Sequence, residues 1–346
     1  MNTDQAVVSA PGKIILFGEH AVVYGEPALA LAIDLRMTVK IQPSSDGVSR
    51  VNGLFIDEYR NRYVKKATEL FWDGVPLEFM TRSSIPNASG LGSSAAITTS
   101  VVGGLMSMRS GIDPGSSDDR GVTPDAIASS PPDEQASPFN EEELARKAFR
   151  VECGVQGKSS PTDTSTSTHG SGVIITREPT DSHLWTIADE GNSWCINHTD
   201  VPDLTIVLGH SRTGANTPML VSKVRRFVES NSFAQDVIRD IGKLTRDGIA
   251  CLRKGDKEQL GELMRRNHDM LAILGINTRG LQTMVDAVRP FSYGAKLTGA
   301  GGGGCIIALS DQPEEASRSI YKMGGRPYVV RTSSQGFSIH DPITGF

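Results

Sequence analysis

A segment rich in glycine and serine, residues 85–96, is the first part of this sequence whose residue types and spacing could do chemistry. It reads Ile85-Pro86-Asn87-Ala88-Ser89-Gly90-Leu91-Gly92-Ser93-Ser94-Ala95-Ala96. Two glycines two positions apart let a backbone approach a bulky anion, and a helix beginning at the serines would present unpaired N–H groups to phosphate. A serine hydroxyl there can also bind a magnesium ion that bridges phosphates. The segment lacks the lysine of a Walker A loop, and alone it is more typical of a tight turn with ordinary helix caps.

A lysine and a Gly-Glu-His tripeptide flank a predicted buried strand near the N-terminus. Lys13 begins the apolar run of residues 13–18, and Gly18-Glu19-His20 ends it. Charged side chains at such positions usually have a partner or a ligand. A structural interpretation, in which Lys13 extends its ammonium to solvent and Glu19 caps a turn, stays open from these residues alone.

Five glycines lie between Lys296 and Cys305, in the segment Lys296-Leu297-Thr298-Gly299-Ala300-Gly301-Gly302-Gly303-Gly304-Cys305. A flexible linker is one interpretation of this composition. An apolar run, residues 305–309, follows directly and predicts a buried strand. Glycines beside a buried strand favour close backbone packing against a neighbouring element or a ligand.

The hydrophobic pattern shows which elements must position these segments. The run 28–33 is compatible with a strand or a short helix, and other runs are clearer. Strands are predicted at 13–18, 38–42, 204–208 and 304–309, and helices at 61–71, 95–108, 217–229, 233–253, 257–274 and 278–289. A further helix is expected after Asn140, with Glu143 completing a capping box, and it delivers Glu152 near its C-terminal end. The mixture predicts an α+β fold with mostly antiparallel strands.

Length and composition bound the class of protein. The 346 residues favour two domains that share a cleft, with a boundary near residues 180–200. The net charge of −5, from 35 basic and 40 acidic residues, argues against a general nucleic-acid binder. We expect no membrane span and no signal peptide, and four widely spaced cysteines predict a cytoplasmic protein without a zinc site or disulfides. Residues 111–138, rich in Ser, Asp, Pro and Gly, predict an exposed, mobile insertion, most simply a surface loop without chemistry.

Together the three segments resemble the motifs of the GHMP kinase superfamily, in the same order along the chain. Residues 9–25 resemble its first motif, 86–96 the second and 296–305 the third. The resemblance covers most of the chain, from residue 7 to about 309. It implies an N-terminal domain like domain 2 of ribosomal protein S5 and a ferredoxin-like C-terminal domain, with the active site in the cleft between them. The domain limits that we expect are residues 1–190 and 191–346.

The resemblance also implies a binding site for ATP and Mg²⁺. The residues expected to bind ATP are Lys13, Ser83, Pro86, Asn87, Ala88, Ser89, Gly90, Leu91, Gly92, Ser93 and Ser94. Ser94 and Glu152 would hold Mg²⁺. Asp163, eleven residues after Glu152, would be the catalytic base that deprotonates the attacking hydroxyl. Lys13 would neutralise the growing charge and keep Asp163 ionised, because a nearby cation favours the charged form of a carboxyl group.

Within the superfamily, residues 17–25 resemble the mevalonate kinase family. Galactokinases would have a Gly-Arg start and Thr-Asp-Tyr after the histidine, and homoserine kinases lack the Gly-Glu-His. The resemblance implies that Glu19, His20 and Thr217 bind mevalonate, so that ATP and mevalonate are the small-molecule partners. It implies neither a nucleic-acid nor a membrane partner and is compatible with a homodimer.

One stretch departs from the more familiar pattern of that family. Before the aspartate the family commonly has His-Gly and Pro-Ser-Gly, whereas this chain has Gln156-Gly157 and Ser160-Pro161-Thr162, a variant of archaeal-type members. The acidic residues are unaffected, but the wall of the pocket differs. Two kinds of rival stay open: a phosphomevalonate kinase or mevalonate 3-kinase, and a non-catalytic nucleotide-binding regulator on the same fold.

Overall fold

The computed structural model describes residues 5–57, 59–86, 89–110, 139–157, 159–189, 191–214 and 217–341. The insertion that the sequence predicts at residues 111–138 lies outside the described residues. Within the described parts of the chain, no helix is both long and apolar enough to cross a membrane.

Nine strands form a mixed sheet in the larger part of the molecule. Seven of them lie in the order β4-β3-β5-β2-β6-β8-β7, and β1 pairs with both β2 and β13. Every pairing is antiparallel except that of β3 with β5. The strands are β1 (Ala6–Phe17), β2 (Ala28–Pro43), β3 (Arg50–Val51), β4 (Leu54–Phe55), β5 (Leu77–Ser83), β6 (Gly172–Thr176), β7 (His183–Asp189), β8 (Asn192–Thr199) and β13 (Ser338–His340).

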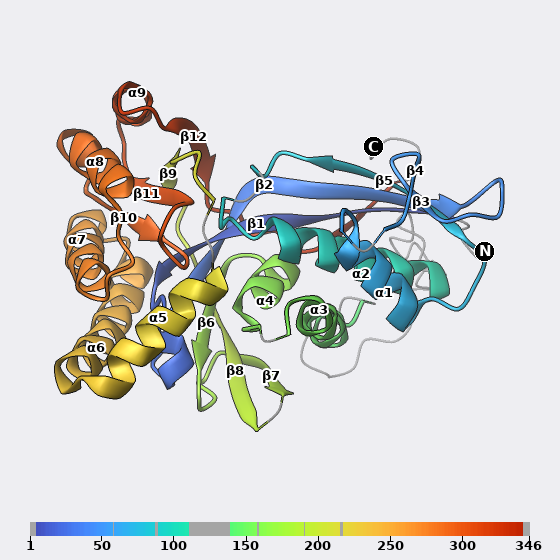
Figure 1. Ribbon diagram of the computed structural model, residues 1–346, viewed down its shortest axis with the longest axis horizontal. Coiled ribbons are helices and arrows are strands. Elements are labelled where there is room, and N and C mark those ends of the chain that lie inside the picture. Colours follow the sequence, from blue (N-terminus) through green and yellow to red (C-terminus); the bar gives the residue numbers. More distant parts are fainter. Residues whose placement is uncertain are drawn as a thin grey trace, which may run out of the picture.

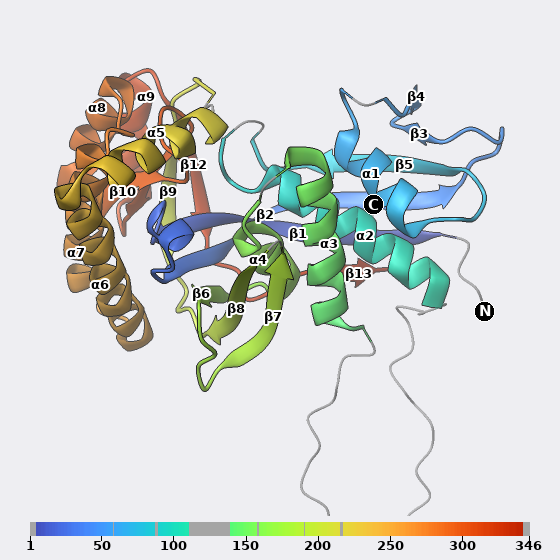
Figure 2. The same cartoon turned by 60° about the horizontal axis from the view of Figure 1, so that its bottom comes forward.

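Four helices cover one face of this sheet, as Figures 1 and 2 show for the long strands β1 and β2. They are α1 (Arg62–Phe71), α2 (Ser93–Ser110), α3 (Glu141–Gln156) and α4 (Thr162–His169), and a short 3-10 helix, η1 (Ala21–Tyr24), follows β1. The cap predicted for α3 is confirmed, because the Asn140 side chain accepts a hydrogen bond from the Glu143 N–H at 3.0 Å. Helix α2 is buried on most sides, as its run of small apolar residues predicts.

A second sheet of four antiparallel strands lies at the other end of the molecule (Figure 1), in the order β10-β11-β9-β12. Its strands are β9 (Thr205–His210), β10 (Gly294–Thr298), β11 (Cys305–Leu309) and β12 (Arg326–Arg331). Its helices are α5 (Thr217–Ser230), α6 (Ser232–Lys254), α7 (Lys257–Ile273), α8 (Arg279–Val288), η2 (Arg289–Phe291) and α9 (Pro313–Lys322). This strand order is that of a ferredoxin-like unit with extra helices after its first strand. The predicted α+β class with mostly antiparallel strands is confirmed.

The sequence patterns locate most elements to within a few residues, with two differences. Residues 28–33 and 38–42 belong to one continuous strand, β2, because β1 pairs along nearly its whole length and satisfies its backbone. Strand β13 has no clear hydrophobic pattern and pairs with β1 only after the chain returns from the second sheet. The chain passes from the first sheet to the second between β8 and β9. The predicted domain limit at residue 190 stays a prediction.

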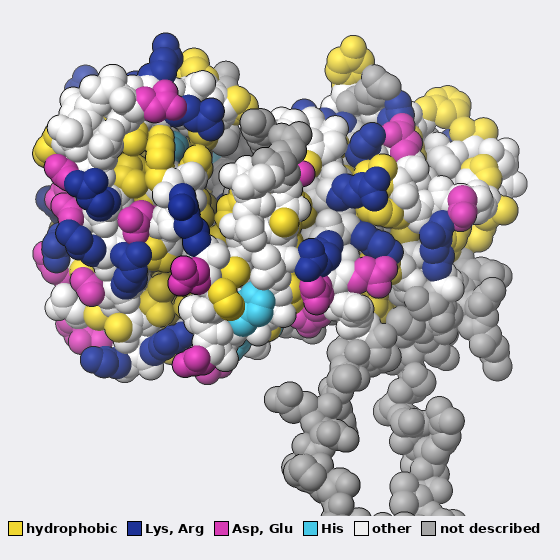
Figure 3. Space-filling model, turned by 90° about the horizontal axis from the view of Figure 1, so that it is seen from below, with side chains coloured by type: hydrophobic (Ala, Val, Ile, Leu, Met, Phe, Trp, Pro, Cys, Tyr) yellow, Lys and Arg dark blue, Asp and Glu magenta, His cyan; other side chains and the backbone are white. Residues whose placement is uncertain are grey.

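One hydrophobic core runs through both parts of the molecule. Its largest cluster includes Leu16 and Phe79 of the first sheet together with Leu208 and Ile307 of the second. Continuous apolar packing fixes the position of one sheet relative to the other. On the face shown in Figure 3, described Lys and Arg side chains are interspersed with Asp and Glu. The described part of this face therefore has no large area of positive charge that would attract an anion, and an anionic ligand would depend on the charged groups of its binding site.

Candidate active site

Lys13 and Asp163 form an ion pair at the centre of the site. The Lys13 ammonium, on β1, lies 2.9 Å from the carboxylate of Asp163, which is in the first turn of α4. The same ammonium donates a hydrogen bond to the Gly90 carbonyl at 3.2 Å. The first turn of a helix is a favourable place for an acidic side chain, because its unpaired N–H groups point toward it. The structure therefore joins the first motif, the glycine-rich segment and the predicted base.

The glycine-rich segment is held against β1 by close backbone contact. The Lys13 N–H donates to the Leu91 carbonyl at 2.9 Å. A Cβ at Gly12 would lie 2.9 Å from the Leu91 oxygen, and one at Gly92 would lie 2.9 Å from Cγ of Lys13. Gly90 and Gly92 have φ values of 76° and 78°, which side chains disfavour. Glycine is thus required at Gly12 and Gly92 for the segment to reach Lys13.

The rest of the predicted ATP-binding segment is ordered by short turns. The Ser89 hydroxyl donates to the Pro86 carbonyl at 2.6 Å, and Ser83 forms a turn with the backbone of Ile85, at 3.2 Å to its oxygen and 3.1 Å to its nitrogen. Ser83 therefore supports the entrance to the segment, and its predicted contact with nucleotide stays a prediction. Ser93 and Ser94 begin α2, as predicted. Asn87 and Ala88 lie outside the described residues.

Glu152 is a buried carboxyl group beside the ion pair. It lies in the last turn of α3, is 1% exposed, and accepts hydrogen bonds from the Ser94 hydroxyl and, at 3.3 Å, from that of Ser159. Burial, followed by the negative charge of Asp163, raises the pKa of Glu152 to about 8. Glu152 and Ser94 offer the hard oxygen donors that Mg²⁺ prefers. Within the described residues no group of three or more His, Cys, Asp or Glu could hold a metal, so an ion here would need ligands from elsewhere.

Glu19 is enclosed rather than open to a ligand. Its carboxylate forms an ion pair with Lys296 of β10, and both side chains are almost completely buried. Burial raises the pKa of Glu19 and lowers that of Lys296, in each case opposed by the partner's charge. The Glu19 side chain is thus largely shielded from solvent, and its predicted contact with substrate stays a prediction. Sequence reasoning did not single out Lys296, although a lysine in a run that forms a buried strand was a signal.

His20 has a positive φ of 61° and is held by the third motif. Its Nε2 lies 3.1 Å from the Ala300 carbonyl, which can only accept, so this nitrogen carries the proton. Burial lowers the pKa of His20, so the ring is neutral near neutral pH and Nδ1 is left as an acceptor. The third predicted substrate residue, Thr217, begins α5 with an exposed side chain, and its contact with substrate stays a prediction.

The five-glycine segment is a fixed loop and not a linker. Two of its backbone N–H groups donate hydrogen bonds, that of Gly302 to the Ile276 carbonyl at 2.7 Å and that of Gly304 to the Thr213 carbonyl at 2.9 Å. A Cβ at Gly304 would lie 3.2 Å from the Ser89 oxygen. The second and third motifs therefore meet, one from each part of the molecule.

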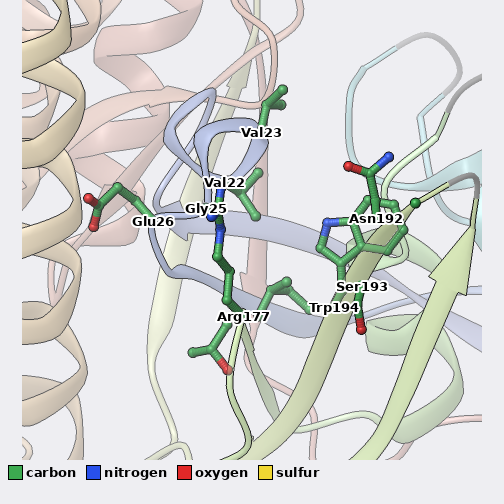
Figure 4. A pocket seen from close by; sticks show the side chains of 11 residues that line it. Val22, Val23, Gly25, Glu26, Arg177, Asn192, Ser193 and Trp194 are labelled. Carbon is green, nitrogen blue, oxygen red and sulfur yellow. The ribbon is translucent and has the colours of Figure 1, made fainter.

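A cavity of about 330 Å³ opens beside η1, directly after His20 in the chain. Figure 4 shows Trp194 of β8 across the cavity from Val22, with Arg177 below them. The Trp194 ring is 5.9 Å from that of Phe149 in α3, so this wall of the cavity packs against the helix that also carries Glu152. The Arg177 guanidinium donates to the Tyr24 carbonyl at 3.0 Å. Sequence reasoning missed Arg177, because no motif marks it.

Comparison with known proteins assigns the class. Residues 62–118 match the family model described as GHMP kinases N terminal domain, and residues 249–328 match GHMP kinases C terminal. A third model, described as a galactokinase galactose-binding signature, matches residues 1–43. The fold and the site around Lys13 and Asp163 thus define a GHMP kinase.

Full-length relatives narrow the assignment. The chain is 31% identical to mevalonate kinase of Pyrococcus abyssi, over 97% of this chain and 98% of that protein. It is 35% identical to mevalonate kinase of Methanothermobacter thermautotrophicus, over 87% and 88% of the two chains. The chain belongs to the mevalonate kinase family, and the archaeal resemblance seen in its sequence is confirmed.

Solved structures agree on the fold. The crystal structure of Methanococcus jannaschii mevalonate kinase has a TM-score of 0.72 and 25% identity, covering 94% of this chain and 98% of that one. A structure of L. major mevalonate kinase in complex with R-mevalonate has a TM-score of 0.74 at 22% identity, covering 96% and 97%, and supports the fold alone.

Proposed function

We propose that this protein transfers the γ-phosphoryl group of ATP to the primary hydroxyl of (R)-mevalonate, giving 5-phosphomevalonate for isoprenoid biosynthesis. The observation that carries the proposal is the Lys13–Asp163 ion pair at 2.9 Å, joined through the Lys13 ammonium to the glycine-rich segment. A carboxylate and an ammonium paired in this way beside the glycine-rich segment would serve as base and as phosphate-binding charge. The names of the full-length relatives supply the substrate.

The residues of the pair divide the reaction between them. Asp163 accepts the proton of the hydroxyl while the hydroxyl oxygen forms a bond to the γ-phosphorus, and the bond to the β-phosphate oxygen breaks to release ADP. Lys13 stabilises the negative charge on the transferring group. Its ammonium needs no reorganisation for this, because Asp163 and the Gly90 carbonyl already hold it in place.

ATP and its metal would be bound between α2 and the five-glycine loop. The backbone of residues 89–94 and the N-terminal end of α2 would face the phosphates, since unpaired helix N–H groups bind anions. Ser94 and Glu152 would hold Mg²⁺, which would neutralise phosphate charge when bound. A cation there also compensates the buried Glu152 carboxylate.

Mevalonate would be bound on the other side of Asp163 by groups that match its chemistry. Nδ1 of His20 accepts a hydrogen bond from a hydroxyl, and Arg177 in the cavity beside η1 offers its guanidinium to the carboxylate. Val22 and Trp194 form an apolar wall for the methyl-bearing carbon. A cytoplasmic location and a homodimer stay predictions from the sequence.

A matched set of turnover assays tests the proposal. ADP release is measured with mevalonate, phosphomevalonate, galactose and homoserine at equal concentrations with MgATP. Galactose is included because residues 1–43 match a galactose-binding signature. We expect kcat/KM for mevalonate to exceed the others by at least about 10²-fold, since the site is built to bind specific polar groups. Faster turnover of another alcohol would show that mevalonate is not the preferred substrate. ATP binding without turnover of any of the four alcohols would identify the protein as a nucleotide-binding regulator.

A further inference from the structure

Three contacts dock the strand β10 and the loop after it onto the first motif. Two of them come from the side chains of Lys296 and Thr298, which share a face of β10, and the third comes from the Ala300 carbonyl in the loop. The contacts join Lys296 to Glu19, Thr298 to Ile15 and Ala300 to His20. Thr298 both accepts from the Ile15 N–H at 3.1 Å and donates to the Ile15 carbonyl at 2.9 Å. The last of the three contacts holds the His20 ring against the loop that follows β10.

The Lys296–Glu19 pair is an unusual way to hold a turn against a strand. Lys296 is 0% exposed and Glu19 2% exposed. Taking two charges out of water is costly, and an apolar pair of similar volume commonly holds a fold as well or better. The second carboxylate oxygen of Glu19, Oε2, is buried without a hydrogen-bond partner in the described part of the chain. An expensive pair that a ligand cannot reach calls for a role other than direct binding.

The neighbouring residue supplies that role. His20 follows Glu19 directly and has a φ of 61°, a conformation that a residue with a side chain keeps only when its surroundings enforce it. On the other side of Glu19, Gly18 has a φ of 93°, and a Cβ there would lie 2.4 Å from the Pro27 oxygen. The turn that presents the imidazole is therefore anchored by backbone fit at Gly18 and by the buried ion pair at Glu19.

We propose that Lys296 is a positioning residue for the hydroxy-acid substrate: it fixes Glu19, and through Glu19 the turn that aims His20, so that Glu19 acts without touching the substrate. The inference rests on the proposed function, because it takes His20 to bind the alcohol substrate that receives the phosphoryl group. It differs from the expectation that Glu19 is itself a substrate ligand. It also gives the lysine of the third motif a role in substrate binding rather than in ATP binding.

The test replaces both charges at once. Lys296→Met alone leaves the Glu19 carboxylate buried without its cation and is expected to fold poorly, so the informative variant is Glu19→Gln with Lys296→Met, which leaves no unpaired charge. We expect this double variant to raise KM for mevalonate by about tenfold or more, with kcat and KM for ATP changed by less than about threefold. Its thermal midpoint, measured by circular dichroism, is expected to stay within a few degrees of the parent. A parent-like KM in the double variant would show that the pair only supports the fold and would overturn the proposal.

A comparison with His20→Ala tests whether Lys296 acts through His20. His20→Ala is expected to raise KM for mevalonate to a similar extent, and adding it to the double variant is expected to raise KM little further, because the two changes remove one function. Effects on KM that multiply would contradict action through His20. The same four proteins are assayed with whichever alcohol the parent phosphorylates best. Rejection of mevalonate would then overturn the proposed substrate, while the comparison would still decide the role of Lys296.

Discussion

The Lys13 ammonium lies 2.9 Å from the Asp163 carboxylate, and the two partners differ sharply in exposure. The Lys13 side chain is 4% exposed, whereas that of Asp163 is 32% exposed. The cation is therefore protected inside the protein while the base faces the open side of the site. This asymmetry suits a reaction in which substrate must reach the base and the cation must stay fixed, and it makes the base the easier partner to replace without disturbing the fold.

Replacing Asp163 is expected to remove catalysis and leave the protein folded. We predict that Asp163→Ala lowers kcat by about 10²-fold or more, because the attacking hydroxyl loses its base. Circular dichroism melting reports the fold, and Asp181→Ala, an exposed aspartate before β7, is the control with parent kcat. Turnover of Asp163→Ala within about threefold of the parent would take the base role from Asp163.

Alanine substitutions at Gly90 and Gly92, the two glycines of the second motif, are expected to impair different steps. A Cβ at Gly92 meets Lys13, whereas a Cβ at Gly90 meets no atom of the described residues within 4 Å. We predict that Gly92→Ala displaces Lys13 and lowers kcat by about tenfold or more, while Gly90→Ala, equally strained at positive φ, mainly raises KM for ATP by extending into the space open to phosphate. Steady-state kinetics with both substrates separates the two, and identical profiles would contradict this division.

Glu152 is expected to weaken the metal-free protein at high pH. Burial raises its pKa from 4.5 to about 8, so the folded state binds this proton more tightly than the unfolded state. The stability this gives is fully present below about pH 4.5 and is lost as the pH rises through about 8. Glu152→Gln cannot ionise, so in EDTA near pH 8.5 it is expected to exceed the parent in unfolding free energy by roughly 2–4 kcal/mol, and by less than about 1 kcal/mol near pH 5. Urea unfolding at both pH values measures the difference, and a parent more stable than the variant near pH 8.5 would contradict the raised pKa.

Arg177 is expected to contribute to the binding of mevalonate and not to the binding of ATP. We predict that Arg177→Met raises KM for mevalonate by about tenfold, since one charged hydrogen-bonding partner is lost, and leaves KM for ATP within about twofold. Arg239→Met, on the outer face of α6 and paired with Asp236, is the matched control. A change in KM for ATP of the same size would place the cavity of Figure 4 on the nucleotide side.

Local sequence determined the class of protein, most of its elements and the parts of its site. Glycines at 90 and 92 before the serines of α2, the Asn140 cap and the Glu152–Asp163 spacing are short-range patterns, and short-range backbone preferences decide them. The same patterns could not locate β13, which depends on β1 for its hydrogen bonds. They could not place Arg177 either, because a cavity arises only when η1, β6 and β8 come together.

The tertiary structure decided how the charged residues are used. The family resemblance of the sequence grouped Glu19 with His20 as substrate ligands. Packing of the second sheet against that strand encloses Glu19 with Lys296 and leaves His20 to the site. Whether a charged side chain binds a ligand or another side chain depends on what excludes water around it, and water is excluded by residues that are distant in sequence. The sequence therefore supplied Lys13, Glu19, Asp163 and Lys296, and only folding paired Lys13 with Asp163 and Glu19 with Lys296.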